Sequence, residues 1–273
     1  HAKHNAAATV ACMEVALDEA REFGVLTVDQ NDQIQDFIEK PEQPEALPDN
    51  PECALASMGI YVFSMEVLKQ ALISDQKNPD SSHDFGKDIL PRLIVSLPVF
   101  AYRFGSHEGR VSQDRYWKDV GTLDAYYEAN IALLDPVPPL NLYQRDWPIR
   151  SYLPQSPPAR TVPGADGHDG VIYNSSIAGG TVINGGTVKH SILSAWVRLE
   201  HAALVEESIL FDNVRVGAGA KLKRCIVDKH VRIPEGEIIG YDLERDRQRF
   251  TVTEKGVVVI GRRADFGQDI DKA

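Results

Sequence analysis

The sequence contains little cysteine. Only Cys12, Cys53 and Cys225 occur in 273 residues, far apart and in an odd number, and none belongs to a C-x-x-C pair. This pattern argues against a disulfide framework and against a zinc site built from cysteines. We therefore expect these residues to be small, buried, apolar side chains.

Long hydrophobic runs are also missing. No segment approaches the roughly 18 apolar residues of a membrane-spanning helix, and no apolar stretch follows a basic start as in a secretion signal. The net charge of −11 disfavours nucleic acid and anionic membrane surfaces as partners. A hydrophobic content of 43% is that of ordinary folded domains. Because both a membrane-spanning run and a secretion signal are missing, we expect a cytoplasmic protein.

The chain opens HAKHNAAATV, without Met, and continues at once into a strand-like segment. We therefore expect it to be a piece of a longer protein. His1 and His4 have the spacing of a metal-binding pair on a helix, but the last turn of a helix is the preferred interpretation.

The first 135 residues alternate between strand and helix patterns. We expect strands at 9–15, 26–28, 33–38, 56–63 and 99–104, and helices at 66–73, at 84–95 with an interruption near Pro91, and from the N-cap Thr122 to residue 134. This order indicates an α/β domain with an antiparallel component. Residues 136–169 contain PVPP, WP, LP and SPP, which is typical of a linker.

A repeat of 17 residues follows, in which HSILSAWVRL, ESILFDNVRV and RCIVDKHVRI align. Its apolar columns are Ile192/Ile209/Ile226, Val197/Val214/Val231 and Leu199/Val216/Ile233. Short β runs separated by turns at this period predict stacked coils, here a left-handed parallel β-helix over 170–273. We expect the Ile and Val columns to point into the coil.

The repeat also places Arg198, Arg215 and Arg232 in one column. Because neighbouring coils lie about 4.8 Å apart, these cations repel by roughly 1 kcal/mol per pair even in water. Solvated arginines beside acidic neighbours are the simpler interpretation. An anion-binding stripe or a subunit contact is the alternative.

Four motifs in the first half contain candidate functional residues. They are FIEKP at 37–41, SMGIYVF at 57–63, HDFGKDILP at 83–91 and YWKDVGT at 116–122. Each is weak alone, but in this order, ahead of a β-helix, they resemble the sugar-1-phosphate nucleotidyltransferases. The resemblance is greatest to the bacterial glucose-1-phosphate adenylyltransferases, covers essentially the whole chain, and includes FGVLTVD, WPIRSYLPQSPPA and RCIVDKHVRIPEG.

This resemblance implies the C-terminal part of a Rossmann-like nucleotidyltransferase domain with a mixed sheet in 1–135, then a linker in 136–169. A β-helix domain for regulation and oligomerisation would occupy 170–273. The implied reaction transfers an adenylyl group from ATP to glucose 1-phosphate with Mg²⁺, giving ADP-glucose for glycogen synthesis. The implied assembly is a homotetramer controlled by anionic effectors, namely sugar phosphates and AMP.

The resemblance also assigns roles to individual residues. The catalytic pair would be Lys40, which holds the sugar phosphate, and Asp119, which holds Mg²⁺; Gly24, Glu39, Ser57, Tyr61, Asp84 and Trp117 would bind or support the substrate, and Arg224 and Arg262 would bind effectors. In a regular strand, Glu39 and Lys40 point to opposite faces, so both reach one ligand only if the strand breaks at Pro41.

One departure limits these assignments. Neither G-x-G-x-x-G nor G-x-x-x-x-G-K occurs, and the family's glycine-rich loop and first metal-binding Asp precede the region where this chain begins. We expect only the sugar-phosphate half of the active site here, so a thymidylyl- or uridylyltransferase remains an alternative. The alternative from a different functional class is a hexapeptide-repeat acyltransferase or a non-catalytic assembly module. In an acyltransferase, His190, His201 or His230 would be the candidate catalytic histidine.

Overall fold

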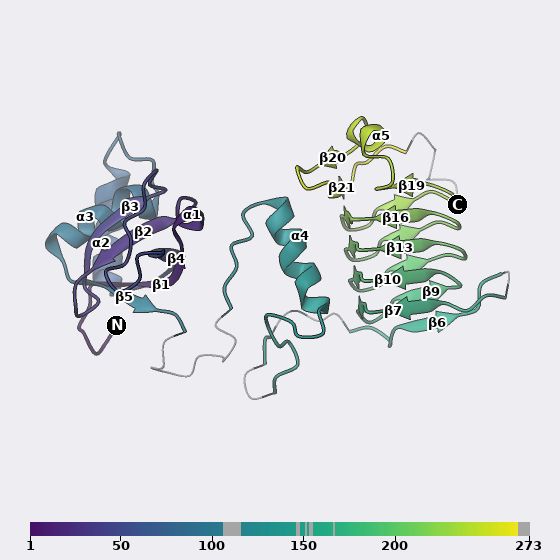
Figure 1. Ribbon diagram of the computed structural model, residues 1–273, viewed down its shortest axis with the longest axis horizontal. Helices are drawn as coiled ribbons and strands as arrows, with labels where there is room; N and C mark the ends of the chain where they lie inside the picture. The colour runs from purple at the N-terminus through teal and green to yellow at the C-terminus, as the bar shows by residue number, and fades with distance from the viewer. Residues whose placement is uncertain (106–115, 146–147, 151, 153–154, 166, 267–273) are drawn as a thin grey trace. The chain divides into compact units, whose positions relative to one another are not determined.

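The computed structural model describes residues 1–105, 116–145, 148–150, 152, 155–165 and 167–266. Contacts divide the chain into two compact units, His1–Trp117 and Lys118–Ala273 (Figure 1). The predicted first domain of residues 1–135 is longer than the first unit. The difference arises because the helix Leu123–Ile131 belongs to the second unit, where it packs on the β-helix.

The first unit contains one mixed sheet with the strand order β3-β2-β4-β1-β5. Its strands are β1 (Ala8–Ala16), β2 (Gly24–Val28), β3 (Ile34–Glu39), β4 (Cys53–Phe63) and β5 (Val99–Arg103). Its helices are α1 (Leu17–Ala20), α2 (Met65–Gln76), the π-helical turn η1 (Phe85–Ile89) and α3 (Leu90–Ser96). Strands β1 and β5 are parallel, whereas the other pairs are antiparallel. The predicted α/β class with an antiparallel component is confirmed.

The interruption expected near Pro91 is also present. The helical pattern at 84–95 is a π-helical turn followed by α3, and Pro91 occupies the first turn of α3. Proline is tolerated there because its missing N–H has no partner within the helix. Leu90 is fully buried beside Leu26 and Leu55, so this helix covers the core face of the sheet.

Residues 1–6 form a turn rather than an assigned helix. The turn has the two backbone hydrogen bonds of a Schellman motif, the usual end of a helix, and Asn5 has the left-handed φ of 48°. The His1 ring is hydrogen-bonded to the Thr9 hydroxyl at 3.0 Å, whereas His4 stacks on Phe100 at 4.6 Å. The two imidazoles therefore have different partners and are not arranged as a metal-binding pair.

The second unit is a left-handed parallel β-helix with three sheets, preceded by a helix (Figure 1). The helix is α4 (Leu123–Ile131), which continues into the 3-10 turn η2 (Ala132–Leu134). One sheet contains β7 (Val171–Tyr173), β10 (Thr187–Lys189), β13 (Leu204–Glu206), β16 (Lys221–Lys223) and β19 (Ile238–Ile239). The second contains β8 (Ser176–Ile177), β11 (Ile192–Leu193), β14 (Ile209–Leu210), β17 (Cys225–Val227), β21 (Val258–Ile260) and β20 (Thr251–Val252). The third contains β6 (Arg160–Val162), β9 (Val182–Asn184), β12 (Arg198–Leu199), β15 (Arg215–Val216) and β18 (Arg232–Ile233).

The first coil begins earlier than predicted. Strand β6 at Arg160–Val162 pairs in parallel with β9, so the end of the expected linker is already part of the β-helix. At the other end, the short helix α5 (Leu243–Arg247) and the β20–β21 hairpin follow the last coil.

One of the two columns predicted to point into the coil does so: the Val197 column is buried in the continuous core of the coils, which confirms this part of the prediction. The Leu199 column is buried in the same core. The Ile column was assigned wrongly. Ile209 and Ile226 are buried, but they pack with Tyr127 of α4, whereas the residue after each points into the coil.

The physical reason is the alternation of side chains along a strand. Each repeat has two successive aliphatic residues at this place, such as Ile209 and Leu210, and only one can face the coil interior. The sequence pattern does not show that α4 covers the other one. A partly buried hydrogen bond from the Tyr127 hydroxyl to the Glu207 carbonyl, 2.6 Å long, fixes α4 on this sheet. The predicted N-cap is confirmed, because the Thr122 hydroxyl accepts from Ala125 N–H at 3.1 Å.

The cysteines are free. Burial raises the pKa of both the Cys12 and the Cys225 thiol to about 12, and Cys53 is half-buried. None of the helices in the described segments is long and apolar enough to cross a membrane.

Candidate functional site

Strand β3 breaks where the predicted site required it to break. The strand ends at Glu39, and Lys40 has the left-handed φ of 48° while its N–H donates to the Phe23 carbonyl at 3.0 Å. A positive φ is uncommon for lysine, and such strain occurs preferentially at functional sites. The exposed Lys40 ammonium has no hydrogen-bond or ion-pair partner among the residues that the structure describes. It is therefore available to an anionic ligand.

Two glycines make room for the Glu39 carboxylate. Gly24 lies opposite Glu39 in the β2–β3 pair, and a Cβ atom there would lie 2.9 Å from Glu39 Oε2. A Cβ atom on Gly86 would lie 2.6 Å from the same oxygen. Sequence analysis missed Gly86, although it is part of the HDFGKDILP motif. The carboxylate is thus held between the backbones of β2 and η1.

Asp84 acts as the cap of η1. Its Oδ1 accepts from Gly86 N–H at 2.8 Å and from Lys87 N–H at 2.9 Å. Asp88 reciprocates by accepting from the Asp84 N–H at 3.1 Å. Asp84 therefore fixes Gly86, and through it the surroundings of Glu39.

Ser57 and Tyr61 lie on one face of β4, on either side of a bulge. Ser57 pairs with Cys12 and Ile60 with Ala11, so Met58 and Gly59 are extra residues in β4. Gly59 has a φ of 68°, and its N–H donates to Ser57 Oγ at 3.2 Å. Sequence analysis missed this bulge. The only signal for it was a glycine in the middle of a strand pattern.

Tyr61 connects this face to the carboxylates. Its ring stacks on Phe85 at 5.6 Å. Burial chiefly raises the pKa of the Tyr61 hydroxyl; a hydrogen bond with Ser57 opposes the rise, and the charges of Glu39 and Asp84 add to it. Gly24, Glu39, Ser57, Tyr61 and Asp84, which were predicted from separate motifs, thus form one cluster.

Trp117 is the aromatic support of this cluster. Its ring packs edge-on against Phe23 at 5.3 Å. Phe23 precedes Gly24, and its carbonyl accepts from Lys40 N–H. Trp117 therefore stabilises the segment against which Lys40 turns.

Asp119 lies in the second unit. It is exposed, and its Oδ2 accepts from Gly121 N–H at 3.1 Å. No cluster of three or more His, Cys, Asp or Glu side chains that could hold a metal occurs in the described parts of the chain. A single carboxylate nevertheless fits Mg²⁺, which usually binds one or two protein carboxylates and completes its shell with water and substrate phosphates.

The two predicted effector arginines lie at opposite ends of neighbouring strands. Arg224 precedes β17 and Arg262 follows β21, which pairs with β17 in parallel. Arg224 is already engaged: it donates to the Lys255 carbonyl at 3.2 Å and lies over the Tyr127 ring at 5.4 Å. Arg262 is more exposed and forms one loose ion pair, 3.7 Å long, with Asp228.

Comparison with known proteins covers both units. A nucleotidyl transferase family model matches residues 1–135, and a GlmU-like C-terminal hexapeptide model matches residues 157–260. The chain is 52% identical to glucose-1-phosphate adenylyltransferase 2 of Vibrio cholerae serotype O1, over 98% of this chain and 66% of that protein. It is 49% identical to glucose-1-phosphate adenylyltransferase of Dechloromonas aromatica, over 95% of this chain and 59% of that protein. The chain belongs to the glucose-1-phosphate adenylyltransferase family.

Family membership agrees with the fold and with the resemblance found in the motifs. The nucleotidyl transferase match extends to residue 135, beyond the first compact unit, and so includes Asp119 and α4. The chain spans between 59% and 66% of the length of these family members.

Proposed function

We propose that this chain supplies the glucose-1-phosphate side of an adenylyltransferase that makes ADP-glucose and pyrophosphate. The main support is the arrangement at the end of β3, where a carboxylate held between two glycine backbones is followed directly by an unpaired lysine. A carboxylate accepts hydrogen bonds from sugar hydroxyls, and an ammonium pairs with phosphate. The two groups together match the two ends of a sugar phosphate.

The reaction asks for positioning more than for acid–base chemistry. An oxygen of the sugar phosphate forms a bond to the α-phosphorus of ATP, and the bond from that phosphorus to the pyrophosphate oxygen breaks. The second pKa of a phosphate monoester is about 6, so the attacking oxygen is largely ionised at neutral pH and needs no protein base. In this proposal Lys40 Nζ donates to the phosphate, Glu39 accepts from hydroxyls, and Ser57 and Tyr61 line the sugar side.

Asp119 is the residue that we assign to Mg²⁺. The bound ion would neutralise charge on the transferred phosphates. The remaining assignments rest on family membership: Arg224 and Arg262 as contacts for sugar-phosphate or AMP effectors, a homotetramer, and a cytoplasmic role in glycogen synthesis. The base specificity for ATP over a thymidylyl or uridylyl donor rests on the same relatives.

The proposal places ATP binding outside these residues, because they contain no glycine-rich phosphate loop. Incubated with ATP, glucose 1-phosphate and Mg²⁺, the chain by itself should release no pyrophosphate above the level of its Asp119→Asn variant. A rate above that level would show that the nucleotide site lies within these residues.

The direct test is calorimetric titration of the chain with glucose 1-phosphate. An ammonium about 4 Å from a phosphate oxygen contributes on the order of 4 kcal/mol at an effective dielectric near 20, and removing one partner of such a pair typically costs about 2–5 kcal/mol. Lys40→Ala should therefore weaken binding by roughly 10²–10³. Lys69→Ala, which removes an exposed lysine of α2, should have no effect. Equal affinities of wild type and Lys40→Ala would refute the site assignment.

A further inference from the structure

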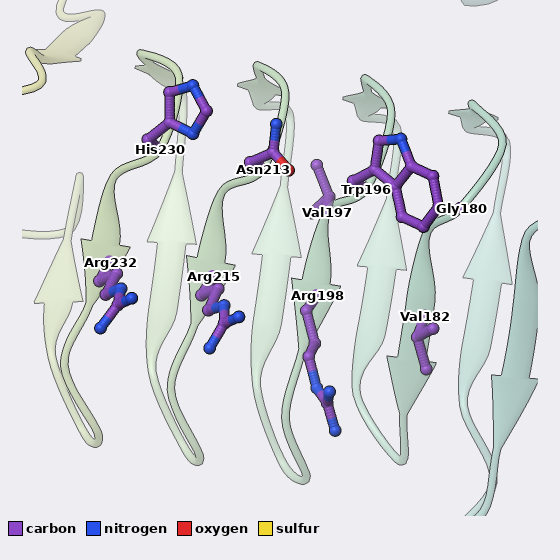
Figure 2. A pocket seen from close by; sticks show the side chains of 9 residues that line it. All are labelled: Gly180, Val182, Trp196, Val197, Arg198, Asn213, Arg215, His230 and Arg232. Atoms are coloured by element: carbon purple, nitrogen blue, oxygen red, sulfur yellow. The ribbon is translucent and has the colours of Figure 1, made fainter. Parts of the chain in front are cut away.

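The outer face of the third β-helix sheet contains a hollow of about 440 Å³. Two rows of side chains line it, one residue per coil: Arg198, Arg215 and Arg232 in one row, and Trp196, Asn213 and His230 in the other (Figure 2). Strand pairing sets Arg198 beside Arg215 and Arg215 beside Arg232, so the guanidinium groups repeat at the strand spacing of about 4.8 Å. Cations are thus concentrated on one face of a chain whose net charge is −11.

The carboxylate that neutralises the first of these arginines is not repeated. Arg198 Nε pairs with Glu200 Oε1 at 2.9 Å. One and two repeats further on, the position of Glu200 is taken by Gly217 and Pro234. Arg215 and Arg232 have no hydrogen bond or ion pair with any described residue. Acidic neighbours therefore account for Arg198 but not for the other two, whose mutual repulsion a bound anion would relieve.

The other end of the hollow is apolar. Trp196 is 42% exposed, and its ring lies on Gly180, where a Cβ atom would be 2.6 Å from Trp196 Cδ2. On that coil Val182 occupies the position of the arginines, because it pairs with Arg198. Figure 2 shows the indole beside Gly180 at the end of the hollow away from Arg232. One hollow therefore joins a flat aromatic surface to unpaired guanidinium groups.

We propose that this hollow binds a ligand that combines phosphate with a flat ring, which is the chemistry of a nucleoside phosphate. The phosphates would lie against Arg215 and Arg232, whose planar guanidinium groups bind phosphate oxygens in pairs. The ring would stack on the exposed indole of Trp196. The site lies on a different sheet from Arg224 and Arg262, uses none of the residues assigned to catalysis, and does not depend on the proposed function.

The test is calorimetric titration of the chain with ADP, pyrophosphate and adenosine. We expect saturable binding of ADP, at least tenfold weaker binding of pyrophosphate, and no measurable binding of adenosine. The double variant Arg215→Gln/Arg232→Gln should weaken both charged ligands at least tenfold. Trp196→Ala should reduce the affinity for ADP to that for pyrophosphate and leave the latter unchanged. Circular dichroism checks that each variant is folded.

Two control variants distinguish binding in this hollow from non-specific attraction and from binding at the sugar-phosphate site. Lys221→Gln removes an exposed cation from the neighbouring sheet, and an equal loss of affinity in that variant would show non-specific attraction and overturn the proposal. Lys40→Ala should have no effect. If it alone abolishes binding, the ligand occupies the sugar-phosphate site, and the present proposal fails while the proposed function stands. Absence of saturable binding at millimolar ligand, or equal affinities for ADP and pyrophosphate, also refutes the two-part site.

Discussion

The two units use left-handed backbone in different ways. In the β-helix such residues recur at coil corners, as Trp196, Asn213 and His230 do with φ values between 61° and 64°. Their chemistry varies because the corner requires only the conformation. In the first unit, Asn5, Asp32 and His83 are of the types that tolerate positive φ, whereas Lys40 is not. We therefore interpret an isolated left-handed residue of an unsuitable type as a candidate functional residue, and a periodic one as a feature of the architecture.

The largest expected effect concerns the repetitive unit. Leu210 is fully buried in the continuous core of the coils. Leu210→Ala should lower the free energy of unfolding of this unit by about 2–5 kcal/mol, because it leaves a cavity that stacked coils cannot easily close. Urea denaturation with hydrogen-exchange readout of the β-helix strands measures it. A loss below about 1 kcal/mol would contradict the assignment of Leu210 to the interior.

The neighbouring residue tests the corrected register. Ile209 is only 2% exposed, but it packs under α4 rather than inside the coil. Ile209→Ala should lower the free energy of unfolding by about 2 kcal/mol, the low end of the range expected for Leu210→Ala, because α4 can move closer to the smaller side chain. Amide protection should fall mainly in α4 and little in the coil strands. Ile192→Ala, at a half-buried position of the same column, is the matched control and should have a smaller effect.

These two residues also show how far the sequence predicts the repetitive unit. The period, the parallel stacking and two of the apolar columns follow from the repeat itself. The repeat does not show which way the Ile column points. Both residues of each Ile-Leu or Ile-Val pair are aliphatic, so either one could face the coil interior. What decides it is α4, which lies outside the repeat and contributes Tyr127 as the cover.

The limits are different in the first unit. The motifs identified Glu39, Lys40, Ser57 and Tyr61, and proline after Lys40 indicated the strand break. They did not indicate that Gly86 would lie against the Glu39 carboxylate, because that approach depends on how η1 crosses β3. Such tertiary contacts between segments far apart in the sequence have no local signal. The roles of these residues in binding remain predictions.

A smaller effect on ligand binding tests the contact that the sequence did not reveal. Gly86→Ala puts a methyl group within 2.6 Å of Glu39 Oε2, so the carboxylate must move. Because a hydrogen bond to a charged group contributes about 1.5–3 kcal/mol, affinity for glucose 1-phosphate should fall about tenfold or more. Gly261→Ala adds its methyl group to open space and should change nothing. Unchanged titration curves for Gly86→Ala would show that Glu39 does not contact the sugar.

The smallest expected effect concerns the pH dependence of stability in the second unit, and it involves the buried carboxylate of Asp246 in α5. Its Oδ2 accepts from Gly240 N–H at 2.7 Å, whereas Oδ1 has no partner among the described residues. Burial raises the pKa of Asp246 above its ordinary 3.8, despite the opposing effects of the Gly240 hydrogen bond and the charges of Arg249 and Arg245. A raised carboxyl pKa means that the folded state disfavours the charged form. The contribution of Asp246 to stability is therefore greatest below pH 3.8 and falls as pH rises through the folded-state pKa.

Asp246→Asn keeps an oxygen for the Gly240 N–H but carries no charge. Its free energy of unfolding relative to wild type should thus increase as pH rises from 3.8 through the folded-state pKa, and then stay constant. Urea denaturation of both proteins at a series of pH values measures this difference, in which the titration of other groups cancels. A difference that stays flat with pH would show that Asp246 is not buried in its charged form. Asp246→Ala is the control: it removes the acceptor of a buried N–H and should destabilise the unit at every pH.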